Sequence, residues 1–262
     1  MRKPAWLLIW CSFLLLQGMS RGMVLDERLT QVHETFLENR REALPGLSDP
    51  FGVPAAARVV LEQSQDALRA KTEWKRNVVA TIFWIGEQPT LNNPTPNHQS
   101  AWDQNWQQNF GGYDEPERRE GYFPVGFSPL LNPFYVALPY NDVAKGGVHK
   151  PEASSVIPWF WERYRGDGIS VCKGRWLAIH HRGRVCYAQW EDVGPFEVDH
   201  WQYVFGQENP RPNRNKGAGI DLSPAVRDYL RLSSGGVVEW RFVEDYEVPR
   251  GPWSSWLTLP HR

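Results

Sequence analysis

The chain has 262 residues, of which 41% are hydrophobic, and its 29 basic side chains nearly balance 30 acidic ones. This composition excludes a disordered chain, and the charge balance provides no basic surface for nucleic acid. The length suits one large domain, or one domain with an extension. The 14 Trp side chains either fill a β-rich core, their commoner use, or stack on sugar rings.

Residues 1–20 are predicted to be a secretory signal peptide. Arg2 and Lys3 supply its positive start, and Ala5–Leu16 is apolar but too short for a standard transmembrane helix. A small-x-small cleavage site ends at Ser20. We therefore expect a secreted or periplasmic protein with no membrane attachment after cleavage. The alternative is an uncleaved anchor.

Residues 21–77 are predicted to form a helical extension. Leu25, Leu29, Val32 and Phe36 recur at helical spacing, and a second helical pattern follows a few turns later. These apolar stripes favour docking against the following domain over a mobile stalk, because a stalk would leave the apolar face in water.

Residues 78–248 are predicted to be a mainly β domain. Apolar runs rich in Val, Ile and aromatic residues predict strands at Val78–Gly86, Trp176–His180, Arg184–Trp190 and Val237–Val243. A short His-Arg-Gly turn joins the second and third runs into a hairpin. Ser223 is a good N-cap before Pro224, so a helix is predicted over Pro224–Leu230.

A long polar insertion is predicted over residues 87–130, within this domain. Its aromatic residues argue against disorder, and they either line a groove wall or pin the loop down: Trp102, Trp106, Phe110 and Tyr113. An aromatic segment near Trp159 and Trp161 is either a ligand platform or a buried short helix. The tail, residues 249–262, is predicted to pack as an irregular strap.

The cysteines predict a disulfide. Cleavage of the signal peptide removes Cys11 and leaves Cys172 and Cys186 as a pair in an oxidising compartment. Closing that loop is worth about 3 kcal/mol in the chain-entropy account. A Cys-based metal or nucleophile site is the alternative, but neither Cys has a CxxC partner. The His residues have no recognisable ligand spacing either, so no metal and no cofactor is predicted.

Two short motifs and their order suggest a family. A strand ends in Asp192-Val193-Gly194-Pro195-Phe196, and Ile220-Asp221-Leu222-Ser223 follows after a loop, before a short helix and a last Val-rich strand. This order resembles the double-psi β-barrel of rare lipoprotein A proteins, and more distantly that of expansins and family 45 glycoside hydrolases. The resemblance implies a six-stranded barrel that also uses Phe134–Leu138 and a short strand near Ile220.

The resemblance also implies a site at Asp192 and Asp221. Asp192 matches an aspartate implicated in glycan cleavage by rare lipoprotein A proteins, and Asp221 lies in an Asp-Leu pattern like that of hydrolases and lytic transglycosylases. A single carboxylic acid with a raised pKa can carry out lytic cleavage, and burial beside Trp190 and Phe196 would raise it. The alternative is that each aspartate only accepts backbone N–H bonds.

Two departures from these families weaken the catalytic interpretation. The general-base Asp of family 45 hydrolases is replaced by Ile85, and the His of rare lipoprotein A proteins is missing from Phe134–Ala137. The motifs and their neighbours nominate five residues for substrate binding: Trp84, Tyr140, Asp142, Trp190 and Arg214. Arg214 lies in a small basic loop that either meets anionic groups of a sugar or is simply solvated.

Three functions therefore stay open. The first is a lytic transglycosylase-like enzyme acting on cell-wall polysaccharide, with peptidoglycan as a candidate. The second is an expansin-like module that binds polysaccharide without cleaving it. The third is a non-catalytic protein-interaction barrel. An open cleft shared by Asp192 and Asp221 would favour the first two.

Overall fold

The computed structural model describes residues 73–90 and 96–255. The chain divides into two compact units, residues 1–57 and 58–262, and all described residues belong to the second. The predicted signal peptide, the extension up to residue 72 and the last part of the tail therefore lie outside the described residues.

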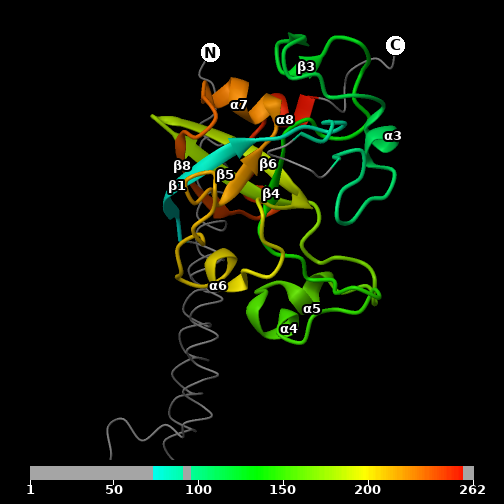
Figure 1. Ribbon diagram of the computed structural model, residues 1–262, viewed down its shortest axis with the longest axis vertical. Coiled ribbons are helices and arrows are strands. Elements are labelled where there is room, and N and C mark those ends of the chain that lie inside the picture. The colour runs from blue at the N-terminus through cyan, green and yellow to red at the C-terminus, as the bar shows by residue number, and fades with distance from the viewer. Residues whose placement is uncertain (1–72, 91–95, 256–262) are drawn as a thin grey trace, which may run out of the picture. The chain divides into compact units, whose positions relative to one another are not determined.

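Six strands close into a β-barrel in the order β1, β7, β4, β6, β5, β8, with β8 paired to β1 (Figure 1). Their bounds are β1 Lys75–Ile82, β4 Tyr135–Leu138, β5 Arg175–His181, β6 Arg184–Val193, β7 Ile220–Leu222 and β8 Val237–Phe242. The prediction of a mainly β chain with a six-stranded barrel is confirmed.

The strand boundaries differ from the expected ones mainly in β1. It begins at Lys75, inside the segment assigned to the helical extension, and ends at Ile82 rather than Gly86. After Ile82 the Phe83 N–H still bonds to the Leu222 carbonyl of β7, and the Gly86 N–H bonds instead to the Asn97 carbonyl of the insertion. Helix α7 spans Pro224–Leu230 as predicted, and the Ser223 hydroxyl accepts a hydrogen bond from the Val226 N–H at 3.4 Å.

The barrel has mixed pairing. Strand β1 is parallel to β7, and β4 is parallel to β6, whereas the other neighbours are antiparallel. Parallel neighbours require long connections: residues 83–219 separate β1 from β7, and residues 139–183 separate β4 from β6.

Strand β6 contains a bulge. Val136 pairs with Trp190, but the next residue, Ala137, pairs with Asp192, so Glu191 is an extra residue in the ladder. Successive side chains in a strand alternate between faces, and one inserted residue reverses that alternation. The bulge therefore moves Asp192 from the core-facing side to the face of Ala137.

The hydrophobic core has two parts. The barrel interior holds most of the buried aromatic and aliphatic residues, including Trp190 and Trp240. The second part lies on the outer face of β4, where Tyr135 and Ala137 pack against Trp106 and Phe110 of the insertion. Four Trp side chains are less than 2% exposed, which supports core filling for these four: Trp106, Trp159, Trp190 and Trp240.

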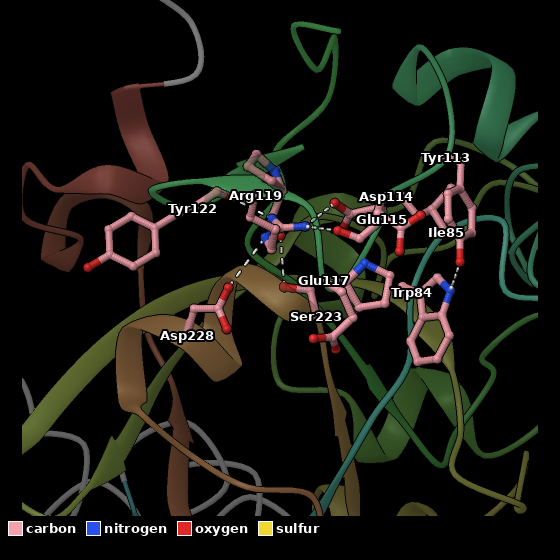
Figure 2. Close-up of polar contacts among 12 residues, drawn as sticks. Trp84, Ile85, Tyr113, Asp114, Glu115, Glu117, Arg119, Tyr122, Ser223 and Asp228 are labelled. Carbon is pink, nitrogen blue, oxygen red and sulfur yellow. Dashed lines mark hydrogen bonds and ion pairs between the residues drawn. The ribbon is translucent and has the colours of Figure 1, made fainter. Parts of the chain in front are cut away.

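The insertion is pinned to the barrel. It contains helix α3, Trp106–Phe110, and a two-stranded ribbon of β2, Arg119–Glu120, and β3, Phe123–Pro124. The buried Tyr135 hydroxyl donates to Asp114 at 2.7 Å, and Arg119 lies between Asp114 and Asp228 (Figure 2). Of the two interpretations of its aromatic residues, packing applies to Trp106 and Phe110, which are 0–1% exposed.

The other connections carry short helices. Between β4 and β5 lie α4, Ala153–Val156, and α5, Phe160–Arg163; α6, Trp201–Val204, follows β6. A 3₁₀ turn, η1, spans Asp245–Glu247, and α8 spans Pro252–Ser255. Trp159 is buried in the core, as expected for a packed short helix, while Trp161 is 74% exposed.

The predicted disulfide between Cys172 and Cys186 is not present in the structure, where both are free, buried thiols. The Gly174 N–H bonds to the Trp190 carbonyl, which places Cys172 near the Trp190 end of the hairpin. Cys186 lies four residues before Trp190 on β6, or roughly 13 Å from it at the rise of a strand. A disulfide requires Cα atoms within about 7 Å, so the hairpin register keeps the two sulfur atoms apart.

Within residues 73–90 and 96–255, no helix is long and apolar enough to span a membrane.

Candidate functional site

The two candidate aspartates lie in one row across the barrel. Ala137 on β4 pairs with Asp221 on β7 and with Asp192 on β6, and Thr81 on β1 pairs with Asp221. Paired residues of neighbouring strands face the same side, so these side chains share the outer face. The two aspartate backbones are two strand spacings apart, roughly 10 Å. We name Thr81, Asp221, Ala137 and Asp192 the carboxylate row.

Asp192 is the more enclosed carboxylate. It is 9% exposed, and its Oδ1 accepts a hydrogen bond from the Ala101 N–H of the insertion at 2.7 Å. Burial raises the pKa of Asp192 to about 7, although the backbone N–H groups of Ala101 and Val193 oppose that rise. The raised pKa and the backbone bond, expected as alternatives, therefore occur together.

Asp221 is partly exposed and hydrogen-bonded. The Thr81 hydroxyl donates to its Oδ1. Burial is the main cause that raises the pKa of Asp221 to about 7, the Thr81 bond opposes it, and the negative charges of Asp192 and Glu87 add to it. A Cβ at Gly194 would lie 3.2 Å from Asp221 Oδ2, so the absence of a side chain there leaves space beside the carboxylate.

Glu191 is a third acidic group that the sequence reasoning missed. Burial raises its pKa to about 7, Lys173 opposes the rise, and Asp103 and Asp192 add to it. Strand alternation alone would not place Glu191 and Asp192 together. The bulge that brings them together is visible only in the strand register.

The chemistry available to the row is proton transfer near neutral pH. Each of the two carboxyl groups has a pKa of about 7, so each can release or take up a proton near neutral pH. A negative charge on Asp192 raises the pKa of Asp221, so the protonation of Asp221 depends on that of Asp192.

Aromatic surface lies next to the row. Phe196, two residues after Gly194, is 45% exposed, and the Arg214 guanidinium lies 5.2 Å from its ring centroid. Trp84 follows β1, and its indole N–H donates to the Tyr113 hydroxyl at 2.9 Å (Figure 2). Of the five predicted binding residues, Trp84 and Arg214 are therefore the two whose side chains are not enclosed in the core.

The other three predicted binding residues make internal contacts. Tyr140, Asp142 and Trp190 are all 0% exposed. The Tyr140 hydroxyl donates to Glu152 at 3.3 Å, and Asp142 accepts from the Val171 N–H at 2.8 Å. The Trp190 indole donates to the Asp192 carbonyl at 2.8 Å, so Trp190 supports the backbone of the row from inside the barrel.

Among residues 73–90 and 96–255, no group of three His, Cys, Asp or Glu side chains is arranged to hold a metal ion. His180 and His200 each contact a single carboxylate, Glu239 at 3.1 Å and Glu208 at 3.0 Å.

Comparisons with known proteins place the chain in no family. No family model matches it. No curated protein matches it either. One matching solved structure is a Streptomyces papain inhibitor, with 13% identity and a TM-score of 0.27, covering 66% of this chain and 97% of the inhibitor. A likeness of this size supports no conclusion about activity.

Proposed function

We propose that this chain is a polysaccharide-directed double-psi β-barrel protein that uses Asp192 and Asp221 as a proton-transfer pair. The observation that carries the proposal is the carboxylate row, in which two motif aspartates share one face and both have a pKa of about 7. The closed six-stranded barrel with two parallel strand pairs is compatible with the double-psi assignment.

Asp221 is the better placed proton donor of the pair. Asp221 as a residue is partly exposed, and Gly194 leaves space beside its Oδ2, whereas Asp192 is 9% exposed and bonded to the Ala101 N–H. In a lytic reaction Asp221 would protonate the leaving glycosidic oxygen as the bond to the anomeric carbon breaks. The resulting carboxylate would then take the proton of the sugar hydroxyl that closes the ring.

In this proposal Asp192 tunes and positions Asp221. A negative charge on Asp192 raises the pKa of Asp221 and keeps it protonated nearer to neutral pH. The exposed ring of Phe196, with Arg214 against it, is suited to stack on a sugar face. The expected location is secreted or periplasmic, where the candidate glycan, peptidoglycan, occurs.

The test is product release from purified peptidoglycan by the full chain. Asp221→Asn should lower the release of anhydro-sugar products by about 10²-fold or more, the usual contribution of a general acid. Asp167→Asn, at an exposed position outside the row, is the matched control and should leave the rate unchanged. Equal activity of wild type and Asp221→Asn would remove the proposed acid.

Two variants at Asp192 separate tuning from structural support. Asp192→Asn keeps an oxygen that can accept the Ala101 N–H, while Asp192→Ala removes it. If Asp192 acts on the pKa of Asp221, both variants should lower that pKa and move the alkaline limb of the pH–rate profile to lower pH, because Asp221 must be protonated to act as the acid. If it only holds the insertion, Asp192→Ala alone should lose about 1–3 kcal/mol of stability.

A second candidate function has its own support. The insertion packs on the outer face of β4 and engages Asp192, and this favours a barrel that binds without cleaving. A wild-type protein that sediments with glycan but releases no product would support the expansin-like alternative. A protein that does neither would leave the protein-interaction barrel.

A further inference from the structure

A cavity of about 430 Å³ lies at the other end of strand β6 from Asp192. Its wall is formed by the β5–β6 turn, by the residue that ends helix α7 and by the start of β8. The side chains that bear on its chemistry are His180, His181, Arg182, Arg231 and Glu239. None of them belongs to the carboxylate row, so this cavity is independent of the proposed glycan site.

The cavity carries excess positive charge. Arg182 and Arg231 are both exposed, and neither guanidinium has an ion-pair or hydrogen-bond partner within the described part of the chain. The one carboxylate of the cavity, Glu239, already contacts the His180 Nδ1 at 3.1 Å and Arg76 at 3.6 Å. Two guanidinium groups therefore remain for a ligand.

The backbone at both arginines adopts a conformation that other residues suit better. Arg182 has φ 45° in a tight turn beside Gly183 at φ 79°, a pair of positive φ values for which Asn-Gly is the preferred sequence. Arg231 ends helix α7 at φ 55°, where Gly or Asn is usual. Local backbone preference accounts for neither arginine, so their side chains are the better explanation for their presence.

One of the two imidazoles can add a third donor when its ring carries a proton on both nitrogens. His181 Nδ1 lies 2.8 Å from the Val237 carbonyl, so Nδ1 carries the proton and Nε2 faces away from that bond. His180 is held differently, because its Nε2 accepts the Gly183 N–H at 3.1 Å and its Nδ1 contacts Glu239. His181 is the imidazole available to a ligand, and His180 orders the turn that carries Arg182.

From these observations we propose that this cavity binds a compact oxyanion ligand, one bearing phosphate or sulfate groups. Each planar guanidinium donates two parallel hydrogen bonds to such a group, and a pair of them matches a ligand with two oxyanions. A volume of about 430 Å³ lies within the range of small-ligand sites and accommodates a pyrophosphate or a phosphorylated or sulfated sugar unit.

The experiment measures binding of inorganic pyrophosphate to the full chain by calorimetry. The double variant Arg182→Gln with Arg231→Gln should weaken binding by at least tenfold. Arg165→Gln is the matched control, because Arg165 is an exposed arginine whose guanidinium bonds to the Glu162 and Tyr164 carbonyls. The control should change the affinity less than twofold.

The source of the oxyanion is separated by parallel titrations. Phosphate and pyrophosphate that bind more tightly than sulfate indicate a phosphorylated ligand, and the reverse order indicates a sulfated one. The ring signals of His181 in the NMR spectrum should shift on binding. Those of His200, which does not line the cavity, should not. Absence of millimolar binding of all three anions by wild type would overturn the proposal.

A second pair of variants guards against simple misfolding. Arg182→Asn and Arg231→Asn relieve the unfavourable backbone conformation, so each should raise the melting temperature by about 1–3 °C while lowering anion affinity. If the Arg165→Gln control lowers the anion affinity equally, the effect comes from the net charge of the protein and not from this cavity. Unchanged anion affinity in both Asn variants would refute the site.

Discussion

The two ends of strand β6 differ in the sign and in the solvent exposure of the charged side chains near them. At one end the carboxylate row places Asp192 under the insertion, where it is 9% exposed and has a pKa of about 7. At the other end Arg182 and Arg231 stand in the open cavity with their guanidinium groups exposed to solvent. The same strand thus carries a desolvated acidic region and a solvated basic one.

The difference has an energetic meaning. Burial disfavours a charged carboxylate, so the acidic end costs folding free energy that the surrounding packing must offset. The basic end keeps its charges in water, and its cost is confined to the left-handed backbone at Arg182 and Arg231. The acidic end should therefore respond to changes in the insertion, whereas the basic end should not.

Trp106→Ala should have the largest effect. The Trp106 side chain is 1% exposed, and its ring centroid lies 5.2 Å from that of Tyr135 and 6.1 Å from that of Phe83. Its removal should cost about 3–5 kcal/mol in urea unfolding. Trp161→Ala, at a 74% exposed position, is the control and should change stability by less than about 0.5 kcal/mol.

The same variant tests the independence of the two ends. Loosening the insertion should admit water to Asp192 and lower its pKa, while pyrophosphate binding at the basic cavity should stay within twofold of wild type. Loss of anion binding in Trp106→Ala, under conditions where the protein is folded, would show that the two ends are coupled.

The pH dependence of stability should come next in size. The pKa of Asp192 is about 7 in the folded state and well above that of an exposed aspartate, 3.8, so the folded state binds more protons between these values. Stability should therefore rise as the pH falls from about 7 to about 4, on the order of 2–4 kcal/mol for this group.

Asp192→Asn isolates that contribution. Asn has no proton to gain in this range, so the difference in unfolding free energy between wild type and variant should change with pH and level off below about pH 4. A difference that is constant from pH 4 to pH 8 would mean that Asp192 is as well solvated as in the unfolded chain.

Tyr135→Phe should have an intermediate effect. The Tyr135 hydroxyl donates to Asp114 at 2.7 Å and accepts from the Ile85 N–H at 3.0 Å. Without the hydroxyl, the Asp114 carboxylate and the Ile85 N–H each lose a hydrogen-bond partner, which should cost about 1–3 kcal/mol of stability. Thermal unfolding measures this, with Tyr246→Phe as the control because Tyr246 is 87% exposed.

The smallest effect should come from reducing agent. Cys172 and Cys186 are free thiols, and burial raises the pKa of both well above the usual thiol range. Dithiothreitol should therefore leave the melting temperature unchanged, and alkylation should label both residues only after denaturation. A melting temperature that falls by several degrees on reduction would instead support the disulfide predicted from the cysteine pair.

Much of the architecture followed from local sequence. Runs of Val, Ile and aromatic residues located the barrel strands because such side chains suit a half-buried pleated surface. Ser223 and Pro224 located helix α7 to the residue, because the cap and the first helical position are local requirements. The two aspartate motifs were likewise found from residue order alone.

The placement of the side chains depended on contacts between distant segments. The bulge at Glu191, the separation of Cys172 from Cys186 and the meeting of Arg182 with Arg231 all arise from strand register and barrel closure. Register is set by pairing between strands that are far apart in the chain, and a shift of one residue reverses which side chains face the core. Sequence by itself thus determined which segments are strands and which residues are acidic or basic, and the tertiary structure alone decided which of them share a face.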